Sequence, residues 1–191
     1  MAEAKIKSII QASIDVKTKT LDDPQIIATL NQVTSVMVQA FKNGNKVLFC
    51  GNGGSAADAQ HLAAEFSGRF YKDRDPLPAE ALHVNTSYLT AVANDYSYSQ
   101  VYSRIIKGSG KSGDVLVGLS TSGNSENIVA AFEQAQKQGI VTVGFTGASG
   151  GKIGPLSNYL LAVPSADTPR IQEVHILLGH IICQLVEETL F

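Results

Sequence analysis

The sequence predicts an α/β fold, a three-layer sandwich in which helices flank a central, mostly parallel β-sheet. Short apolar runs typical of buried strands alternate with helical segments of about ten residues or more, and parallel strands need crossovers of that length. Two apolar runs end in loops rich in glycine or serine, as at strand-to-helix junctions. With 191 residues, 44% hydrophobic and 17% charged, and no internal repeat or linker, the chain fits one domain with a sizeable core.

Residues from 1 to about 43 are expected to form an N-terminal extension of two helices. Apolar residues recur there at helical spacing. The segment Asp22–Asp23–Pro24 supplies a cap and a first-turn proline to the second helix, and Asn43–Gly44–Asn45 ends it. The apolar positions are Ile6, Ile9, Ile10 and Ile14 in the first helix, and Ile26, Leu30, Val33, Met37, Ala40 and Phe41 in the second.

The rest of the chain alternates between strands and helices. Strands are expected at residues 46–50, 79–84, 115–119, 140–145 and 159–163. Helices are expected from the loop at 51–55 to about residue 70, from 87 to 93 as the beginning of a run, and over 125–138 and 170–190. Ligands of such sheets gather beyond the carboxyl ends of the strands, so the loops at those ends are the first candidates for a site.

Charge and hydropathy argue against nucleic-acid and membrane partners. The net charge is -2, which gives no global field to capture an anionic polymer or surface. No apolar run approaches the ~20 residues of a membrane span, and Met1–Lys5 opens a polar stretch without a signal core. Cys50 and Cys183 lie in apolar runs and are expected to be buried thiols. We therefore expect a cytoplasmic protein that binds neither nucleic acid nor membranes.

The most informative motif is the serine loop, residues 120–125 (Ser-Thr-Ser-Gly-Asn-Ser), which follows the apolar run at 115–119. A strand-to-helix junction directs backbone N–H groups and the positive end of a helix dipole outward, which suits a phosphate. The loop has no lysine and so differs from the phosphate loop of nucleoside triphosphatases. The alternative is a turn with a helix cap, because Ser, Gly and Asn favour both.

A second junction of this kind is the glycine loop, residues 51–55 (Gly-Asn-Gly-Gly-Ser). Its glycines would let a ligand touch the backbone, and Ser55 can cap the next helix. The third glycine of the dinucleotide motif is missing, so a dinucleotide site is not favoured. One polar ligand between the serine loop and the glycine loop would explain both.

His61 and Glu65 follow the glycine loop at positions i and i+4, so they lie on one face of the expected helix. Such a pair can ligate a divalent metal or place a general base beside a substrate, and the alternative is a surface ion pair. The apolar neighbours indicate a mostly buried helix, in which a carboxylate needs a reason. Arg69, one turn beyond Glu65, can bind phosphate or pair with Glu65.

The last expected helix carries four polar residues among apolar ones: Gln172, Glu173, His175 and His180. A histidine on such a helix is more often a satisfied core residue than a catalyst, and His175 is the better candidate for the core role. His83 stands alone near a strand end, with nothing to mark it as functional. Asn94 and Asp95 are typical of a cap or a turn.

Together these motifs resemble the sugar isomerase (SIS) domain family, and within it the bacterial phosphoheptose isomerases, over nearly the whole chain. The segments that carry the resemblance are residues 50–61 (CGNGGSAADAQH), Glu65 with Gly68–Arg69, Asn94–Asp95, residues 120–125, and Arg170–Glu173 with His175 and His180. The resemblance implies one SIS domain over residues 1–191, with a flavodoxin-like or Rossmann-like fold. It also implies a homotetramer with active sites at subunit interfaces, and conversion of sedoheptulose 7-phosphate to D-glycero-D-manno-heptose 7-phosphate for bacterial surface polysaccharide.

The resemblance further implies roles for single residues. The phosphate would be held by Ser120, Thr121, Ser122 and Ser125. The sugar site would be lined by Asn52, Gly53, Gly54, Asn94 and Asp95, with Ser55, His61, Glu65, Arg69 and Gln172 completing the substrate-binding set. Proton transfer would fall to Glu65 and His180, and one Zn²⁺ per subunit would bind His61, Glu65, Gln172 and His180. Glu65 cannot easily be both a tight zinc ligand and a free base, so the zinc could be structural, modulatory or displaced during turnover.

One departure and three alternatives remain open. Some family members place an acidic residue directly before the arginine at 170, where this chain has Pro169, so Asp167 is the nearest substitute. The alternatives are a non-catalytic SIS module (a sugar-phosphate-sensing regulator or a replication-initiator-associating protein), an isomerase of another phosphosugar, and a structural metalloprotein. Retention of Glu65 and His180 favours an enzyme over a regulator, and a core this large does not need a metal to fold.

Overall fold

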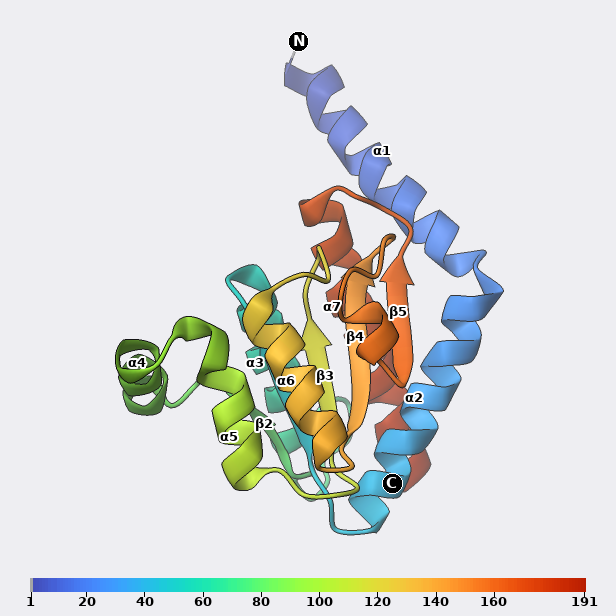
Figure 1. Ribbon diagram of the computed structural model, residues 1–191. Helices are drawn as coiled ribbons and strands as arrows, with labels where there is room; N and C mark the ends of the chain where they lie inside the picture. Colours follow the sequence, from blue (N-terminus) through green and yellow to red (C-terminus); the bar gives the residue numbers. More distant parts are fainter. Residues whose placement is uncertain (1) are drawn as a thin grey trace.

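The computed structural model describes residues 2–191, which form one parallel sheet and the helices around it (Figure 1). Within that range the strand order is β2-β1-β3-β4-β5, and every neighbouring pair is parallel. The strands are β1 (Val47–Gly51), β2 (Ala79–Ala81), β3 (Val115–Leu119), β4 (Val141–Gly147) and β5 (Tyr159–Val163). The helices are α1 (Ala2–Leu21), α2 (Pro24–Lys42), α3 (Gly54–Ser67), α4 (Thr86–Asp95), α5 (Val101–Ser109), α6 (Glu126–Lys137) and α7 (Thr168–Leu190), with 3₁₀ turns η1 (Tyr98–Gln100) and η2 (Gly154–Leu156).

Alternate residues of the central strands join two cores, one on each face of the sheet. Val47 and Phe49 pack with α2, α3 and α7, whereas Leu48 and Cys50 pack with α5 and α6 (Figure 1). Residues two apart in a strand point to the same face, which explains this division. The predicted three-layer sandwich is confirmed.

The ends of several elements differ from the predicted ones. Strands 115–119 and 159–163 are confirmed, but β2 is shorter than the predicted 79–84. Helix α3 ends at Ser67, before the predicted limit of about 70, where Gly68 donates its N–H to the Ala64 carbonyl. Ser55 is not the cap of α3: Gly53 occupies that position, with a φ of 55° that glycine adopts without strain, and Ser55 is buried in the first turn.

The predicted elements do not include η1 and α5, which connect α4 to β3. The buried residues of α5 are Val101, Tyr102 and Ile106. Their spacing is helical, but it extends over a single short element. In Figure 1, α4 stands out from one side of the molecule and α5 leads the chain back to the sheet.

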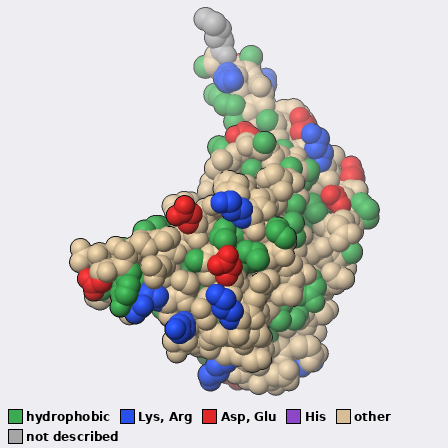
Figure 2. Space-filling view, viewed as in Figure 1, with side chains coloured by type: hydrophobic (Ala, Val, Ile, Leu, Met, Phe, Trp, Pro, Cys, Tyr) green, Lys and Arg blue, Asp and Glu red, His purple; other side chains and the backbone are tan. Residues whose placement is uncertain are grey.

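Helix α1 projects away from the sheet (Figure 1), and its buried residues are Val16 and Thr20. The apolar stripe predicted from its spacing is exposed, with Ile6 at 57% and Ile10 at 55% of full accessibility. Figure 2 shows hydrophobic side chains at this surface. An apolar face of this kind on a projecting helix is typical of a protein–protein contact.

The predicted burial of the two thiols and of His175 is confirmed. Cys50 and Cys183 are buried free thiols. His175 is fully buried on α7, and its Nε2 lies 3.1 Å from the Thr146 carbonyl oxygen, to which it can donate. In the described part of the chain, no helix is both long enough and apolar enough to cross a membrane.

Candidate functional site

The serine loop lies at the carboxyl end of β3, beside the glycine loop at the end of β1. Strands β1 and β3 are neighbours, and Gly51 pairs in register with Leu119. The loop closes on itself through the Ser120 and Ser125 hydroxyls, whose oxygens are 3.0 Å apart. Gly123 has a φ of 67°, and a Cβ there would collide with the carbonyl of Gly150, so only glycine fits this turn.

The helix that follows the serine loop begins with open backbone donors. Ser125 occupies the N-cap position of α6, but its hydroxyl makes no capping bond to an N–H in the described residues. The first N–H groups of a helix have no partner within it, and they carry the positive end of its dipole. A side-chain cap would have occupied these N–H groups. Without one, they remain free to donate to an anion.

An amide pair joins the glycine loop to the first turn of α6, directly after the serine loop. Asn52 Nδ2 donates to Asn127 Oδ1 at 2.9 Å, and Asn127 Nδ2 donates to Asn52 Oδ1 at 2.8 Å. The Tyr98 hydroxyl donates to the same Asn52 oxygen at 3.2 Å. Beside this pair is a surface cavity of about 350 Å³ lined by Asn52, Tyr98, Ser99, Ser125, Glu126 and Asn127. The predicted site residues did not include Asn127 and Tyr98.

A second group of reactive side chains lies between α3 and α7. His61 Nε2 is 2.9 Å from Glu65 Oε1, and the Nε2 atoms of His61 and His180 are 3.4 Å apart. One ligand atom from each of the three residues lies within 4.8 Å of the others. The predicted proximity of His61 and Glu65 is thus confirmed, and α7 brings His180 to them.

Exposure corrects one expectation about this cluster. Helix α3 is not mostly buried: it buries the side that carries Leu62 and Phe66, and the His61 side chain is 49% exposed. Burial and the nearby His61 lower the pKa of His180, and the Glu65 carboxylate opposes them. His180 is therefore a neutral imidazole near pH 7, able to accept a proton or bind a metal.

The other predicted residues lie apart from this cluster. Gln172 sits against Gly54, where a Cβ would come within 2.8 Å of Gln172 Nε2, and it precedes His180 on α7 by about 12 Å of helical rise. Asn94 and Asp95 end α4, are exposed, and share a hydrogen bond of 3.0 Å. Arg69 is exposed, and within residues 2–191 it forms no ion pair with Glu65.

Three further sequence features take no part in the cluster. Asp167 occupies the N-cap position of α7, where its backbone N–H donates to Ser165 Oγ. Glu173 pairs with Arg170 at 2.7 Å. Burial lowers the pKa of His83, whose buried Nδ1 has no partner in the described chain.

The two groups are well separated within one chain. Glu65 lies eleven residues along α3 from Gly54, a rise of about 16 Å. The serine loop adjoins the core on the α6 side of the sheet, whereas α3 and α7 cover the opposite side. The two groups therefore do not form one compact pocket within a single chain.

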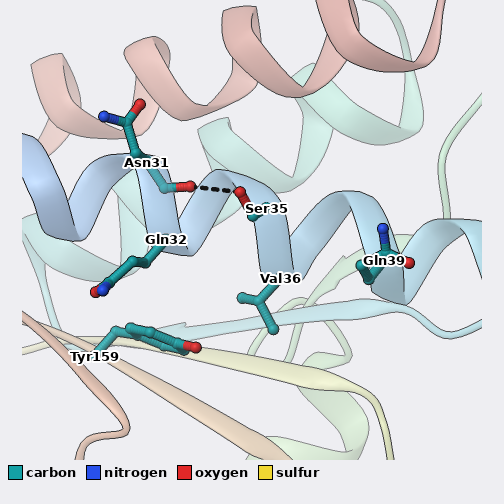
Figure 3. A pocket seen from close by; sticks show the side chains of 6 residues that line it. All are labelled: Asn31, Gln32, Ser35, Val36, Gln39 and Tyr159. Atoms are coloured by element: carbon teal, nitrogen blue, oxygen red, sulfur yellow. Dashed lines mark hydrogen bonds between the residues drawn. The ribbon is translucent and has the colours of Figure 1, made fainter.

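A groove between α2 and the edge strand β5 lies away from both groups (Figure 3). It has a volume of about 430 Å³ and is lined by Asn31, Gln32, Ser35, Val36, Gln39 and Tyr159. Amides, a hydroxyl and a phenol line it in Figure 3, and its lining contains no carboxylate, imidazole or thiol. We therefore assign it no acid–base or metal chemistry.

Comparisons with known proteins agree over nearly the whole chain. The SIS domain family matches residues 15–147. A phosphoheptose isomerase of Aneurinibacillus thermoaerophilus is 53% identical over 186 residues, covering 97% of this chain and 94% of that protein. The solved phosphoheptose isomerase of Neisseria gonorrhoeae superposes with a TM-score of 0.92 at 40% identity, covering 98% of this chain and 100% of its own. That of Francisella tularensis gives 0.93 at 36% identity, covering 98% and 99%.

Proposed function

Because the chain belongs to the SIS domain family, and within it to the phosphoheptose isomerases, we propose that it interconverts sedoheptulose 7-phosphate and D-glycero-D-manno-heptose 7-phosphate. The product would enter bacterial heptose and surface-polysaccharide synthesis. The observation that carries the proposal is the His61–Glu65–His180 cluster, since it adds acid–base groups to a fold whose serine loop offers donors to a phosphate. A binding module has no need of such a cluster.

In this proposal the serine loop holds the phosphate. The hydroxyls of Ser120, Thr121, Ser122 and Ser125 and the open N–H groups of α6 supply donors without a lysine, which suits a reversible grip on a monophosphate. The glycine loop, with Asn52, then lies against the sugar. The remaining sugar contacts predicted from the sequence are Gly53, Gly54, Ser55, His61, Arg69, Asn94, Asp95 and Gln172.

The reaction moves a carbonyl between C2 and C1 of the open-chain sugar. The Glu65 carboxylate takes the proton from C1 of the ketose, which leaves an enediolate, and returns it to C2 to form the aldose. The neutral His180 imidazole moves the second proton between the oxygens on C1 and C2.

The cluster also fits a zinc ion, because two imidazole nitrogens and a carboxylate oxygen are ligands that Zn²⁺ prefers. We propose His61, Glu65 and His180 as ligands, with one ion per subunit. Within one chain, Gln172 lies against Gly54. It becomes the fourth ligand only if it comes from a neighbouring copy of the chain. A bound ion would polarise the sugar oxygens. Because a tight zinc ligand is not a free base, Glu65 and His180 would transfer protons only when released from the ion.

We further propose that the chain is one SIS domain, with residues from 1 to about 43 as its helical extension, and that it acts as a homotetramer. Two features support the assembly: the exposed isoleucines of α1, and the separation of the serine loop from Glu65 and His180 within one chain. A neighbouring copy would cover the exposed isoleucines of α1. It would also bring its serine loop close to Glu65 and His180 of this chain. Two free thiols favour the reducing cytoplasm as the site of action.

The test is NMR detection of the aldose formed from sedoheptulose 7-phosphate, with five- and six-carbon ketose phosphates for comparison, each with and without Zn²⁺. Glu65→Gln and His180→Asn should abolish turnover, while Glu80→Gln, an exposed carboxylate on β2, should not. In D₂O the parent should incorporate deuterium at the reacting carbons and Glu65→Gln should not. Phosphosugar binding without turnover would instead identify a regulatory module.

A further inference from the structure

A buried ion pair lies beside the His61–Glu65–His180 cluster. The side chains of Arg74 and Glu187 are each only 2% exposed, and Arg74 Nε lies 2.9 Å from Glu187 Oε2. Arg74 follows α3, and Glu187 lies on α7 two turns beyond His180. Removing two charges from water is costly, so such a pair must be held by good geometry and additional hydrogen bonds.

Arg74 caps the C-terminal end of α3. Its Nη2 donates to the Glu65 carbonyl at 2.8 Å, and its Nη1 donates to the Phe66 carbonyl at 2.8 Å. The same Nη1 reaches the carbonyls of Gly68 and Asp75, at 3.1 and 3.0 Å. The last carbonyls of a helix have no partner within it. The guanidinium therefore fixes the backbone of the residue that carries the candidate base.

Glu187 holds the segment that packs on His180. Its Oε1 accepts the N–H groups of Tyr71 and Lys72, each at 2.8 Å, and its Oε2 accepts the N–H of Phe70 at 3.2 Å. The Phe70 ring lies against His180, with the ring centroids 5.6 Å apart. Burial raises the pKa of Glu187, but the three N–H donors and the guanidinium outweigh it and hold the pKa below its usual value.

We propose that the Arg74–Glu187 pair is a positioning device for the candidate reaction. Arg74 sets the backbone of Glu65, and Glu187, through Phe70, sets the ring of His180. The effect of the Arg74–Glu187 pair on turnover rests on the proposed function, whereas its effect on the positions of Glu65 and His180 does not.

Close packing between the two helices makes this device effective. A Cβ at Gly179 of α7 would lie 2.5 Å from Leu62 of α3, so the two helices are in close contact at this point. A shift of the C-terminal end of α3 or α7 therefore changes the distance between His61 and His180, because the packing between the helices cannot compensate for it.

The test compares Arg74→Lys, Glu187→Gln and Phe70→Leu with the control Asp114→Asn. Lysine keeps the charge at position 74 but lacks the planar fork that reaches several carbonyls. Asp114 is a matched control, since it is a buried carboxylate that accepts backbone N–H groups and pairs with Lys46 at 3.2 Å. It precedes β3, at the opposite end of the strand from the serine loop.

Three measurements on the full-length protein decide the question: the imidazole NMR signals of His61 and His180 without metal, the affinity for Co²⁺ by visible absorption, and kcat and KM with the heptulose phosphate. In Arg74→Lys and Glu187→Gln we expect the imidazole signals to shift and Co²⁺ affinity to fall about 10- to 100-fold. We expect kcat to fall on the order of 100-fold with KM close to the parent value. Asp114→Asn should lose thermal stability alone.

The proposal is overturned if Arg74→Lys and Glu187→Gln resemble Asp114→Asn in all three measurements. Phe70→Leu leaves the ion pair intact and tests whether Glu187 positions His180 through Phe70, even where Glu187→Gln fails to fold. Unchanged His180 signals in Phe70→Leu overturn this part of the proposal. If the parent protein turns over no heptulose phosphate, the proposed function fails, and the imidazole signals alone still decide whether the pair positions the cluster.

Discussion

Replacing His175 by glutamine should remove a loss of stability that the parent protein shows between neutral pH and pH 5. Burial lowers the pKa of His175 to about 4, against a smaller opposite effect of the hydrogen bond to the Thr146 carbonyl. The unfolded chain has an ordinary histidine pKa of about 6.5. As the pH falls below that value, protons bind the unfolded state first, so stability present above pH 6.5 is lost on acidification.

The magnitude follows from the difference between the two pKa values. At about 1.4 kcal/mol for each unit, the loss grows to about 2 kcal/mol at pH 5 and about 3 kcal/mol near pH 4. Glutamine stays neutral across this range and keeps an amide that can donate to Thr146. At neutral pH, His175→Gln should be less stable than the parent. Between pH 7.5 and 5, its free energy of unfolding should lack the loss that His175 causes in the parent.

Urea unfolding followed by circular dichroism at pH 7.5 and 5.0 measures the effect, with protein concentration held fixed because assembly adds to apparent stability. An independent check is the His175 imidazole signal, which should not titrate above pH 5 in the folded protein. Equal losses in parent and variant between the two pH values would refute the reasoning.

Three further changes have defined outcomes. Gly179→Ala places a Cβ 2.5 Å from the Leu62 methyls, and urea unfolding should show a loss of about 1–3 kcal/mol despite the better helix propensity of alanine. Gly123→Ala forces a side chain onto a φ of 67° and against the Gly150 carbonyl, and KM for the sugar phosphate should rise on the order of tenfold while the fold survives. Burial raises the pKa of Asp114, but its hydrogen bonds and Lys46 outweigh this and lower it, so stability is lost as pH falls below about 4, and Asp114→Asn should flatten that acid limb in thermal melts.

The sheet and its two loops were predictable because their signals are local. The apolar run at 115–119 needs no partner to indicate a buried strand, and the serine loop directly after it indicates a junction. Likewise, His61 and Glu65 meet because one helical turn separates them. Periodicity and composition carry this information within a few residues.

The contacts that complete the site depend on residues far apart in the chain. Asn127 is one polar residue in an ordinary helix, and only the register of β1 on β3 brings it to Asn52. Arg74 and Glu187 are 113 residues apart and look like surface charges in the sequence. The exposure of His61 was also mispredicted, because alanine neighbours do not distinguish a helix face packed in the core from one left exposed.

The reciprocal bonds between Asn52 and Asn127 also bear on the chemical lifetime of the protein. Asn52 precedes Gly53, and an asparagine before glycine is the sequence most prone to deamidation, since the following N–H can attack the side-chain carbonyl to close a succinimide. That attack needs the side chain to swing toward its own backbone, whereas here both atoms of the amide are held by Asn127 and the oxygen also by Tyr98. The contact between the glycine loop and α6 thus also protects the loop from deamidation, and the conversion that it resists would place a carboxylate beside the proposed phosphate-binding loop.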